Sequence, residues 1–154
     1  MQRIHLSEKT IDRVIIQLYN ITQRYNSGGI MKKLGDAELE IMLVLWETKE
    51  PVTSTFILEQ VKETRTWKLP TLMTVLARLV EKGFVYCDRS TRTNYYTALV
   101  EEKEYKEQES QSFLEKLYGN SLRNLVATLY DGKVVSKEDL NELKKMIEEI
   151  EERK

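Results

Sequence analysis

The chain has 154 residues, enough for one domain of ordinary size or two small ones. Its 24 basic and 25 acidic residues nearly cancel, so overall charge gives no strong signal for binding a polyanion. The single cysteine excludes an internal disulfide and leaves no zinc-ligand spacing. No apolar run approaches the roughly 18 residues of a membrane span and no signal peptide is visible, so we expect a cytoplasmic protein without membrane insertion.

Charge is unevenly distributed along the chain. Residues 65–100 carry six basic and two acidic residues, whereas residues 101–154 carry 10 basic and 14 acidic residues. A locally basic window followed by an acidic, helical tail is typical of a modest DNA-binding module joined to a separate interaction domain.

The first 25 residues predict one amphipathic helix. Ser7 fits an N-cap, and apolar residues then recur with a 3.6-residue period at Ile11, Val14, Ile15, Leu18 and Ile21. The sequence Asn-Ser-Gly-Gly at 26–29 breaks this pattern and predicts a linker. We therefore expect residues 1–30 to form an appended arm, whose partner the sequence does not indicate.

Residues 35–66 predict two helices and a turn. The first helix starts at Gly35, with Glu38 in the position of a capping-box residue, and ends at 49–51. Its buried face consists of Ala37, Ile41, Val44 and Leu45, widened by Leu39, Met42 and Trp46. Thr53 or Ser54 caps a shorter helix, whose inward residues are Phe56, Ile57 and Val61.

Residues 67–83 predict a third helix with two different faces. Pro70 suits its first turn and Gly83 suits a left-handed C-cap. Leu72, Val75, Leu76 and Leu79 form an apolar stripe, and the opposite face carries Thr71, Thr74, Ala77 and Arg78, with Met73 and Glu81 at its margins. Short hydroxyls allow close approach to a polar surface, and an arginine can fork onto a phosphate or a guanine edge. We interpret this as a DNA recognition helix; the alternative is a surface helix with a threonine-rich face.

The period changes directly after Gly83. Residues 84–86 and 95–100 are β-prone, and the turn at 88–94 between them contains Arg89 and Arg92. A hairpin that follows helix, short helix, turn and helix indicates a winged helix-turn-helix rather than a generic hairpin. We expect contacts with DNA from seven residues: Lys68, Thr71, Met73, Thr74, Arg78, Arg89 and Arg92.

Residues 101–154 predict three short helices, which end near Gly119, at Asp131-Gly132 and at the chain's last residues. The stretch from Ser136 to Asp139 is predicted to cap the third. About fifty residues are too few to bury their apolar faces well alone, so we expect two copies to cover each other in a homodimer. The alternative is that these helices pack back onto the winged helix. The predicted dimer residues are Phe113, Leu117, Leu122, Leu125, Leu129, Leu140, Leu143 and Ile147.

The predicted fold class is therefore mainly α with a small antiparallel β hairpin: a winged helix-turn-helix followed by a helical dimerisation domain. The predicted domains are residues 1–30 (helical arm and linker), 31–102 (winged-helix DNA-binding domain) and 103–154 (helical dimerisation domain). The hinge between the last two is expected near Val100–Glu104, where the second wing strand ends and charge density rises.

Four stretches carry a family resemblance: residues 34–42 with Trp46, residues 71–84, residues 95–102 and residues 112–118. Together they resemble the penicillinase-repressor family, the winged-helix repressors of β-lactamase and methicillin-resistance genes. The resemblance implies a homodimer that binds an operator palindrome. It also implies release when a membrane β-lactam sensor triggers cleavage in the C-terminal domain.

The chain departs from the family pattern in three places. Pro70 and Met73 stand where relatives often carry basic residues. The bond that is cut in the resistance repressors is Asn-Phe, and its counterpart here is Ser112-Phe113, the candidate cleavage bond. The copper-responsive branch of the family carries a C-terminal cysteine cluster, which this chain lacks.

These observations favour a homodimeric transcriptional repressor that binds double-stranded operator DNA, without a metal or cofactor. We do not expect an enzyme, because the only histidine, His5, lies in the polar arm and Cys87 has no histidine near it in sequence. The alternative is a winged-helix module that binds proteins instead of DNA, against which the basic wing argues.

Overall fold

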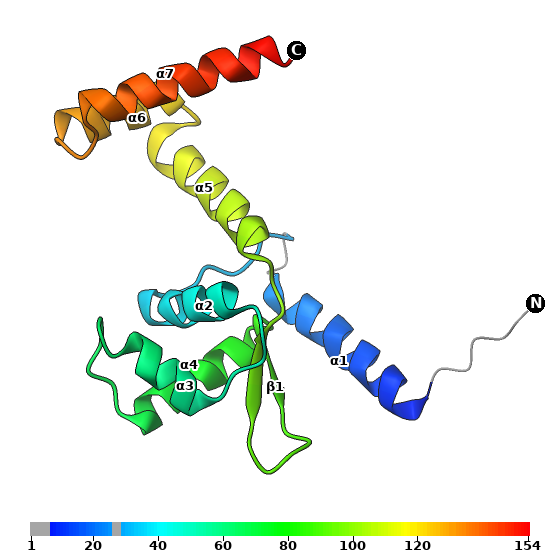
Figure 1. Ribbon diagram of the computed structural model, residues 1–154. Coiled ribbons are helices and arrows are strands. Elements are labelled where there is room, and N and C mark those ends of the chain that lie inside the picture. The colour runs from blue at the N-terminus through cyan, green and yellow to red at the C-terminus, as the bar shows by residue number, and fades with distance from the viewer. Residues whose placement is uncertain (1–6, 26–28) are drawn as a thin grey trace, which may run out of the picture. The chain divides into compact units, whose positions relative to one another are not determined.

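The computed structural model describes residues 7–25 and 29–154 (Figure 1). In chain order they form α1 (Glu8–Arg24), α2 (Asp36–Thr48), α3 (Ser54–Val61), α4 (Leu69–Glu81), β1 (Val85–Asp88), β2 (Tyr95–Ala98), α5 (Glu102–Tyr118), α6 (Leu122–Asp131) and α7 (Lys137–Glu152). The predicted fold class is confirmed. Neither His5 nor residues 26–28 of the predicted linker belong to the described part. No helix in that part is long and apolar enough to cross a membrane.

The chain forms two compact units, which divide between Gln108 and Glu109, within α5. Helices α2, α3 and α4 pack on one another in the first unit and enclose its core. The largest side chains that are fully buried there come from these three helices and from the start of the wing: Ile41, Met42, Ile57, Leu72, Leu76, Leu79, Phe84 and Val85.

Helix α3 confirms one predicted cap and corrects one predicted core residue. Thr53 is the N-cap, and its hydroxyl oxygen accepts from the Phe56 amide at 3.2 Å. Ile57 and Val61 are buried as predicted, but Phe56 is 38% exposed, so its prediction as an inward residue is wrong. Ile57 and Val61 are one helical turn apart and define the buried stripe, and Phe56 lies about 100° away from Ile57 around the axis.

The wing is an antiparallel pair in which Val85 lies opposite Ala98 and Asp88 opposite Tyr95. Strand β1 therefore reaches into the predicted turn and β2 ends earlier than predicted. The Asp88 carboxylate accepts from the Ser90 amide at 2.9 Å, which turns the chain only after Asp88. Val52, between α2 and α3, pairs with Tyr96 through hydrogen bonds of 3.1 and 2.7 Å and so anchors the wing to the helices.

Helix α1 packs on the end of α4 and the base of the wing, through a contact at Gly83 and Leu99 that we call the seat of α1. Asn20 and Arg24 are buried, and the Arg24 guanidinium donates to the carbonyls of Gly83 at 3.3 Å and Leu99 at 2.7 Å. Gly83 has a φ of 79°, and a Cβ built there would lie 2.0 Å from the Asn20 carbonyl oxygen. Only glycine allows α1 to approach this closely, so α1 belongs to the first unit.

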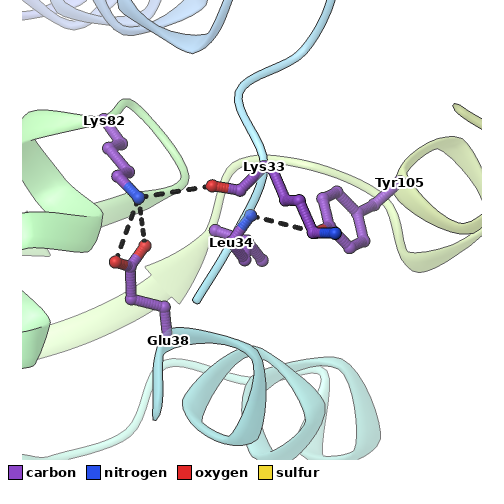
Figure 2. Close-up of polar contacts among 5 residues, drawn as sticks. All are labelled: Lys33, Leu34, Glu38, Lys82 and Tyr105. Atoms are coloured by element: carbon purple, nitrogen blue, oxygen red, sulfur yellow. Dashed lines mark hydrogen bonds and ion pairs between the residues drawn. The ribbon is translucent and has the colours of Figure 1, made fainter. Parts of the chain in front are cut away.

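Tyr105, in the first turns of α5, also belongs to the first unit. It is buried, its ring centroid lies 5.9 Å from that of Trp46, and its hydroxyl accepts from the Leu34 amide at 3.0 Å (Figure 2). The boundary predicted at 102/103 assigns this residue to the C-terminal domain instead. The core contact explains why the first unit continues to Gln108.

The second unit, Glu109–Lys154, contains the rest of α5 together with α6 and α7. Ser121 caps α6, and Ser136 and Asp139 form a reciprocal capping box at the start of α7, as predicted for that serine. None of the residues 109–154 is buried. The helices are therefore set by local signals, whereas their apolar faces remain open.

The substitution Gly83→Ala tests the seat of α1. An alanine there adopts an unfavourable backbone conformation and its methyl group meets the Asn20 carbonyl, so we expect the free energy of unfolding to fall by about 3 kcal/mol. Gly29→Ala is the matched control, because Gly29 has a φ of 73° but a Cβ there meets nothing within 4 Å. The control should lose about 1 kcal/mol. Urea unfolding measures both, and equal losses would contradict the close contact between α1 and Gly83.

Candidate nucleic-acid interface

Helix α4 has one buried face and one exposed face. Its predicted apolar stripe is confirmed, because Leu72, Val75, Leu76 and Leu79 are at most 6% exposed. The residues predicted for the opposite face, Thr71, Thr74, Ala77 and Arg78, are all exposed, and so is Met73 at its margin. The helical period produces this division, and it turns a short-chained surface with one arginine toward solvent.

The start of α4 offers a cation but few backbone donors, because Pro70 has no N–H and the Thr71 amide donates to the Lys68 carbonyl at 3.0 Å. Lys68 is the N-cap residue, is exposed, and makes no side-chain capping bond. Pro70 lies in the first turn as predicted. The positive end of the helix dipole favours an anion such as a phosphate there. The Thr74 hydroxyl donates to the Pro70 carbonyl at 3.0 Å, which leaves its oxygen as an acceptor on the exposed face.

An ion pair fixes the turn that precedes α4. The Arg65 guanidinium donates to Glu40 of α2 at 2.8 Å and lies over the Trp67 ring, 5.3 Å from its centroid. The hydrogen bond from Arg65 lowers the pKa of Glu40, as does a weaker one from Thr64. Arg65 is therefore engaged inside the protein, although it contributes to the basic window of the sequence.

A second ion pair fixes the end of α4. Lys82 donates to the two carboxylate oxygens of Glu38 at 2.7 and 3.0 Å and to the Lys33 carbonyl at 3.4 Å (Figure 2). Glu38 is 8% exposed, so this is a largely desolvated pair. The expectation that Glu38 serves as a capping-box residue is wrong, because the N-cap Gly35 has no side chain to complete the box and the carboxylate turns to Lys82.

The wing presents the remaining arginines. Arg89 and Arg92 are exposed in the loop between β1 and β2, which a hydrogen bond of 2.7 Å from the Thr91 hydroxyl to the Thr93 carbonyl shapes. At the margin of the α4 face, the Tyr96 hydroxyl of β2 lies 4.0 Å from the Met73 sulfur. The helix and the wing therefore adjoin there.

The structure thus sorts the six basic residues of the window into two groups. Arg65 and Lys82 pair with carboxylates of α2, and Lys68, Arg78, Arg89 and Arg92 are exposed. All seven residues predicted to contact DNA are exposed. Sequence reasoning missed the buried polar residues Asn20 and Arg24, which hold α1 to Gly83; polar residues opposite the apolar stripe of an amphipathic helix give no signal that they are buried.

The residues predicted for dimerisation lie in the second unit and are all accessible. Phe113, Leu117, Leu122 and Ile147 are 43 to 65% exposed, and Leu125, Leu129, Leu140 and Leu143 are half-buried. The candidate cleavage bond, Ser112-Phe113, lies inside α5. Within residues 7–25 and 29–154, no group of three potential ligands could hold a metal ion.

Comparison with known proteins adds family evidence. The family model described as Penicillinase repressor matches residues 34–149. The penicillinase repressor of Bacillus licheniformis is 34% identical over 127 residues, which cover 80% of this chain and 98% of the relative. The methicillin resistance regulatory protein MecI of Mammaliicoccus sciuri is 28% identical over 115 residues, which cover 75% of this chain and 93% of the relative.

Solved structures were also matched. The DNA-binding domain of the repressor BlaI aligns with 34% sequence identity and a TM-score of 0.41, covering 49% of this chain and 94% of that chain. The monomeric form of Bacillus licheniformis BlaI in complex with the blaP half-operator aligns with 31% identity and a TM-score of 0.42, covering 48% of this chain and 89% of that chain.

The ion pair before α4 predicts a pH-dependent contribution to stability. The folded-state pKa of Glu40 is lowered from its ordinary value of 4.5. The contribution is therefore fully present above that value and disappears as the pH falls through the lowered pKa. Glu40→Gln should lower the melting temperature modestly at pH 7, because the pair is partly exposed, and the difference from the unaltered chain should vanish in acid.

Thermal unfolding followed between pH 7 and pH 2 measures this difference. Glu59→Gln is the control, since Glu59 pairs with Lys62 on the exposed surface of α3 and should change little at any pH. A loss at Glu40 that persists undiminished in acid would show that the ion pair is not its cause.

Proposed function

The chain belongs to the penicillinase repressor family, and from that premise we propose that it is a DNA-binding transcriptional repressor that reads its operator through α4. The observation that carries the proposal is the exposed face of α4. Its residues are short, one arginine stands at its end, and the exposed basic residues around it are Lys68, Arg89 and Arg92.

The proposed reading mechanism uses α4 in the major groove. The Thr71 hydroxyl, at the start of the helix, donates to a phosphate, which the positive end of the helix dipole also attracts. Thr74 is short enough to let the helix approach the base edges. Arg78 reaches a base, where a guanine presents the O6 and N7 acceptors that fit a guanidinium fork. The ion pairs of Arg65 and Lys82 support this by fixing both ends of α4 against α2.

The wing contributes charge in this proposal. Arg89 and Arg92 extend from a loop rather than from a helix, so contacts with phosphates are favoured over precise readout of bases. The hydrogen bonds from Ser90 lower the pKa of Asp88, so this carboxylate stays ionised beside the arginines. The balance of the loop is nevertheless positive, as a phosphate-binding wing requires.

The second unit supplies the dimer in this proposal. None of its residues is buried, and its apolar residues are too large a share of three short helices to be left in water. Two copies that cover each other would place two copies of α4 on a palindrome, so that binding one half-site favours binding the other.

We also propose that the repressor is released from DNA by proteolytic cleavage of the chain. The Ser112-Phe113 bond lies in the middle of α5, so a protease must first unwind that helix locally. A cut there would separate the first unit from α6 and α7, which carry most of the predicted dimer residues. A membrane-linked sensor pathway would be the source of the protease.

Replacement of Arg78 and Thr74 tests the reading face. On genomic fragments that co-purify with the chain, Arg78→Ala should weaken binding by about 1–3 kcal/mol if the contact with a base is bidentate, and Arg78→Ala with Thr74→Ala should weaken it further. Arg153→Ala, which removes an exposed arginine at the end of the chain, is the control and should have no effect. Undiminished affinity of the double variant would show that α4 does not recognise the operator.

Replacement of both wing arginines tests the wing. Arg89→Ala with Arg92→Ala should weaken binding to operator and random DNA alike, and should make the slope of log affinity against log salt shallower by roughly 0.9 per lost contact. Lys144→Ala with Lys145→Ala removes the same charge from α7 and should leave the slope unchanged. A loss confined to the operator would mean that the wing reads sequence instead.

A further inference from the structure

Helix α1 carries an apolar face that the first unit leaves exposed. Ile11, Val14, Ile15, Leu18 and Ile21, the stripe predicted from the sequence, are 43 to 58% exposed, and Tyr19 beside them is 61% exposed. The family model begins at residue 34, so it does not include this helix. An exposed patch of this kind usually marks an interaction site.

The exposed stripe and the seat of α1 lie on opposite sides of the helix. Asn20 and Arg24 are one turn apart and buried against Gly83, and at 100° per residue Leu18 lies about 160° from Asn20 around the axis. Ile16 and Asn20 line a cleft with Val85 and Tyr86 of β1, so this side of α1 faces the wing. The stripe is therefore held facing away from the first unit by a fixed seat.

The spacing of the stripe fits a partner helix. Ile11, Val14, Leu18 and Ile21 alternate in steps of three and four, which is the a and d pattern of two heptads. Of the positions next to this seam, Thr10, Ile15, Gln17 and Thr22 are uncharged, and the guanidinium of Arg24 is held by the carbonyls of Gly83 and Leu99. A copy of the same helix would therefore meet it without repulsion between like charges.

The charges of α1 argue against other occupants. Its exposed charged residues are Glu8, Lys9, Asp12 and Arg13, so they balance. A helix that lies on an anionic membrane surface or on DNA needs a polar face rich in lysine and arginine. A self-complementary contact across a two-fold axis needs only the same apolar patch on both copies.

We propose that the seam Ile11, Val14, Leu18 and Ile21 of α1 pairs with α1 of a second copy of this chain. The contact rests on the proposed homodimer, because α1 has only 17 residues and two heptads bury less than the roughly 1,000 Å² that an independent interface needs. Contacts between the second units keep the two copies together, and pairing of the α1 helices then costs no further loss of free translation.

Pairing of the two α1 helices would affect the distance between the two copies of α4 in the dimer. Because the C-terminal end of α1 sits on Gly83, two residues after the end of α4, a contact between the α1 helices restricts how far apart the two copies of α4 can lie. The spacing between half-sites that a dimer accepts is set by that distance. The arm would therefore adjust which operators the dimer can bind.

Sedimentation equilibrium of the full chain without DNA tests the pairing. Leu18→Glu places a charge in the seam and should raise the dimer dissociation constant about tenfold. Tyr19→Glu places the same charge one residue away, on an exposed side chain outside the seam and its flanking positions, and should change it by less than about twofold. Leu18 is 58% exposed, so its replacement leaves the core intact, which the circular dichroism spectrum and melting temperature verify.

Disulfide formation provides a second measurement, which shows which positions of the two α1 helices lie close together. Cys87 is the only cysteine, so Cys87→Ser gives a background in which Ile11, Val14, Leu18 and Ile21 are replaced by cysteine one at a time. In a parallel pair all four positions lie within reach of their own copies, and in an antiparallel pair the position nearest the two-fold axis does. Gln17→Cys, outside the seam, should form no disulfide-linked dimer.

An unchanged dissociation constant for Leu18→Glu, or no disulfide-linked dimer at any seam position, would overturn the proposal. Leu122→Glu in the second unit distinguishes this from a failure of the proposed homodimer. If Leu122→Glu weakens the dimer and the α1 variants do not, only the pairing of α1 is wrong. If the unaltered chain is a monomer, the homodimer and the pairing of α1 are both wrong, while DNA binding is judged separately by the Arg78 variants.

Discussion

The complete burial of one stripe of α4 is the constraint on which the rest of the first unit depends. Leu72 and Leu79 have no exposed surface, so this helix cannot rotate about its axis without opening the core. Two ion pairs with α2, Arg65–Glu40 before the helix and Lys82–Glu38 after it, fix its ends. The face opposite the core is thereby oriented by packing, so the helix itself needs no rearrangement to meet a ligand.

The same constraint shows why a count of charges misjudges an interface. Arg65 and Lys82 contribute to the basic window of the sequence as much as Arg78 does, yet both form ion pairs with carboxylates of α2. Periodicity could predict which residues of α4 lie outward, because the buried stripe is regular. It could not predict the two ion pairs, because each joins residues more than twenty positions apart.

The elements that sequence predicted well are those with local signals. The caps Thr53 and Ser136 and the positive φ of Gly83 are set by neighbours in the chain. What the sequence did not predict involves tertiary contacts. Phe56 is exposed because Ile57 and Val61 form the buried stripe of α3, and Tyr105 is buried in the core of the first unit although it lies beyond the predicted boundary. The contact between α1 and Gly83 was not predicted either. A glycine at the end of α4 is expected as a C-cap whether or not another helix packs on it.

The protein thus combines one unit that closes its own core with a second that does not. The first unit buries residues from α2, α3, α4, the wing and Tyr105 around one centre. The second consists of capped helices without a buried residue, and α1 adds a further open apolar face to the first. The proposed homodimer on a two-fold symmetric operator would use this organisation, in which the first unit has its own core and the open apolar surfaces are covered by another copy.

Amide NMR of the full chain, with and without a co-purifying genomic fragment, tests the central claim most directly. The account predicts that the largest shifts on adding DNA fall on residues 71–78 of α4 and on the loop from Arg89 to Arg92, with the amides of the buried stripe changing less. Shifts concentrated on α1 or on residues 109–154, with α4 and the wing unaffected, would contradict it.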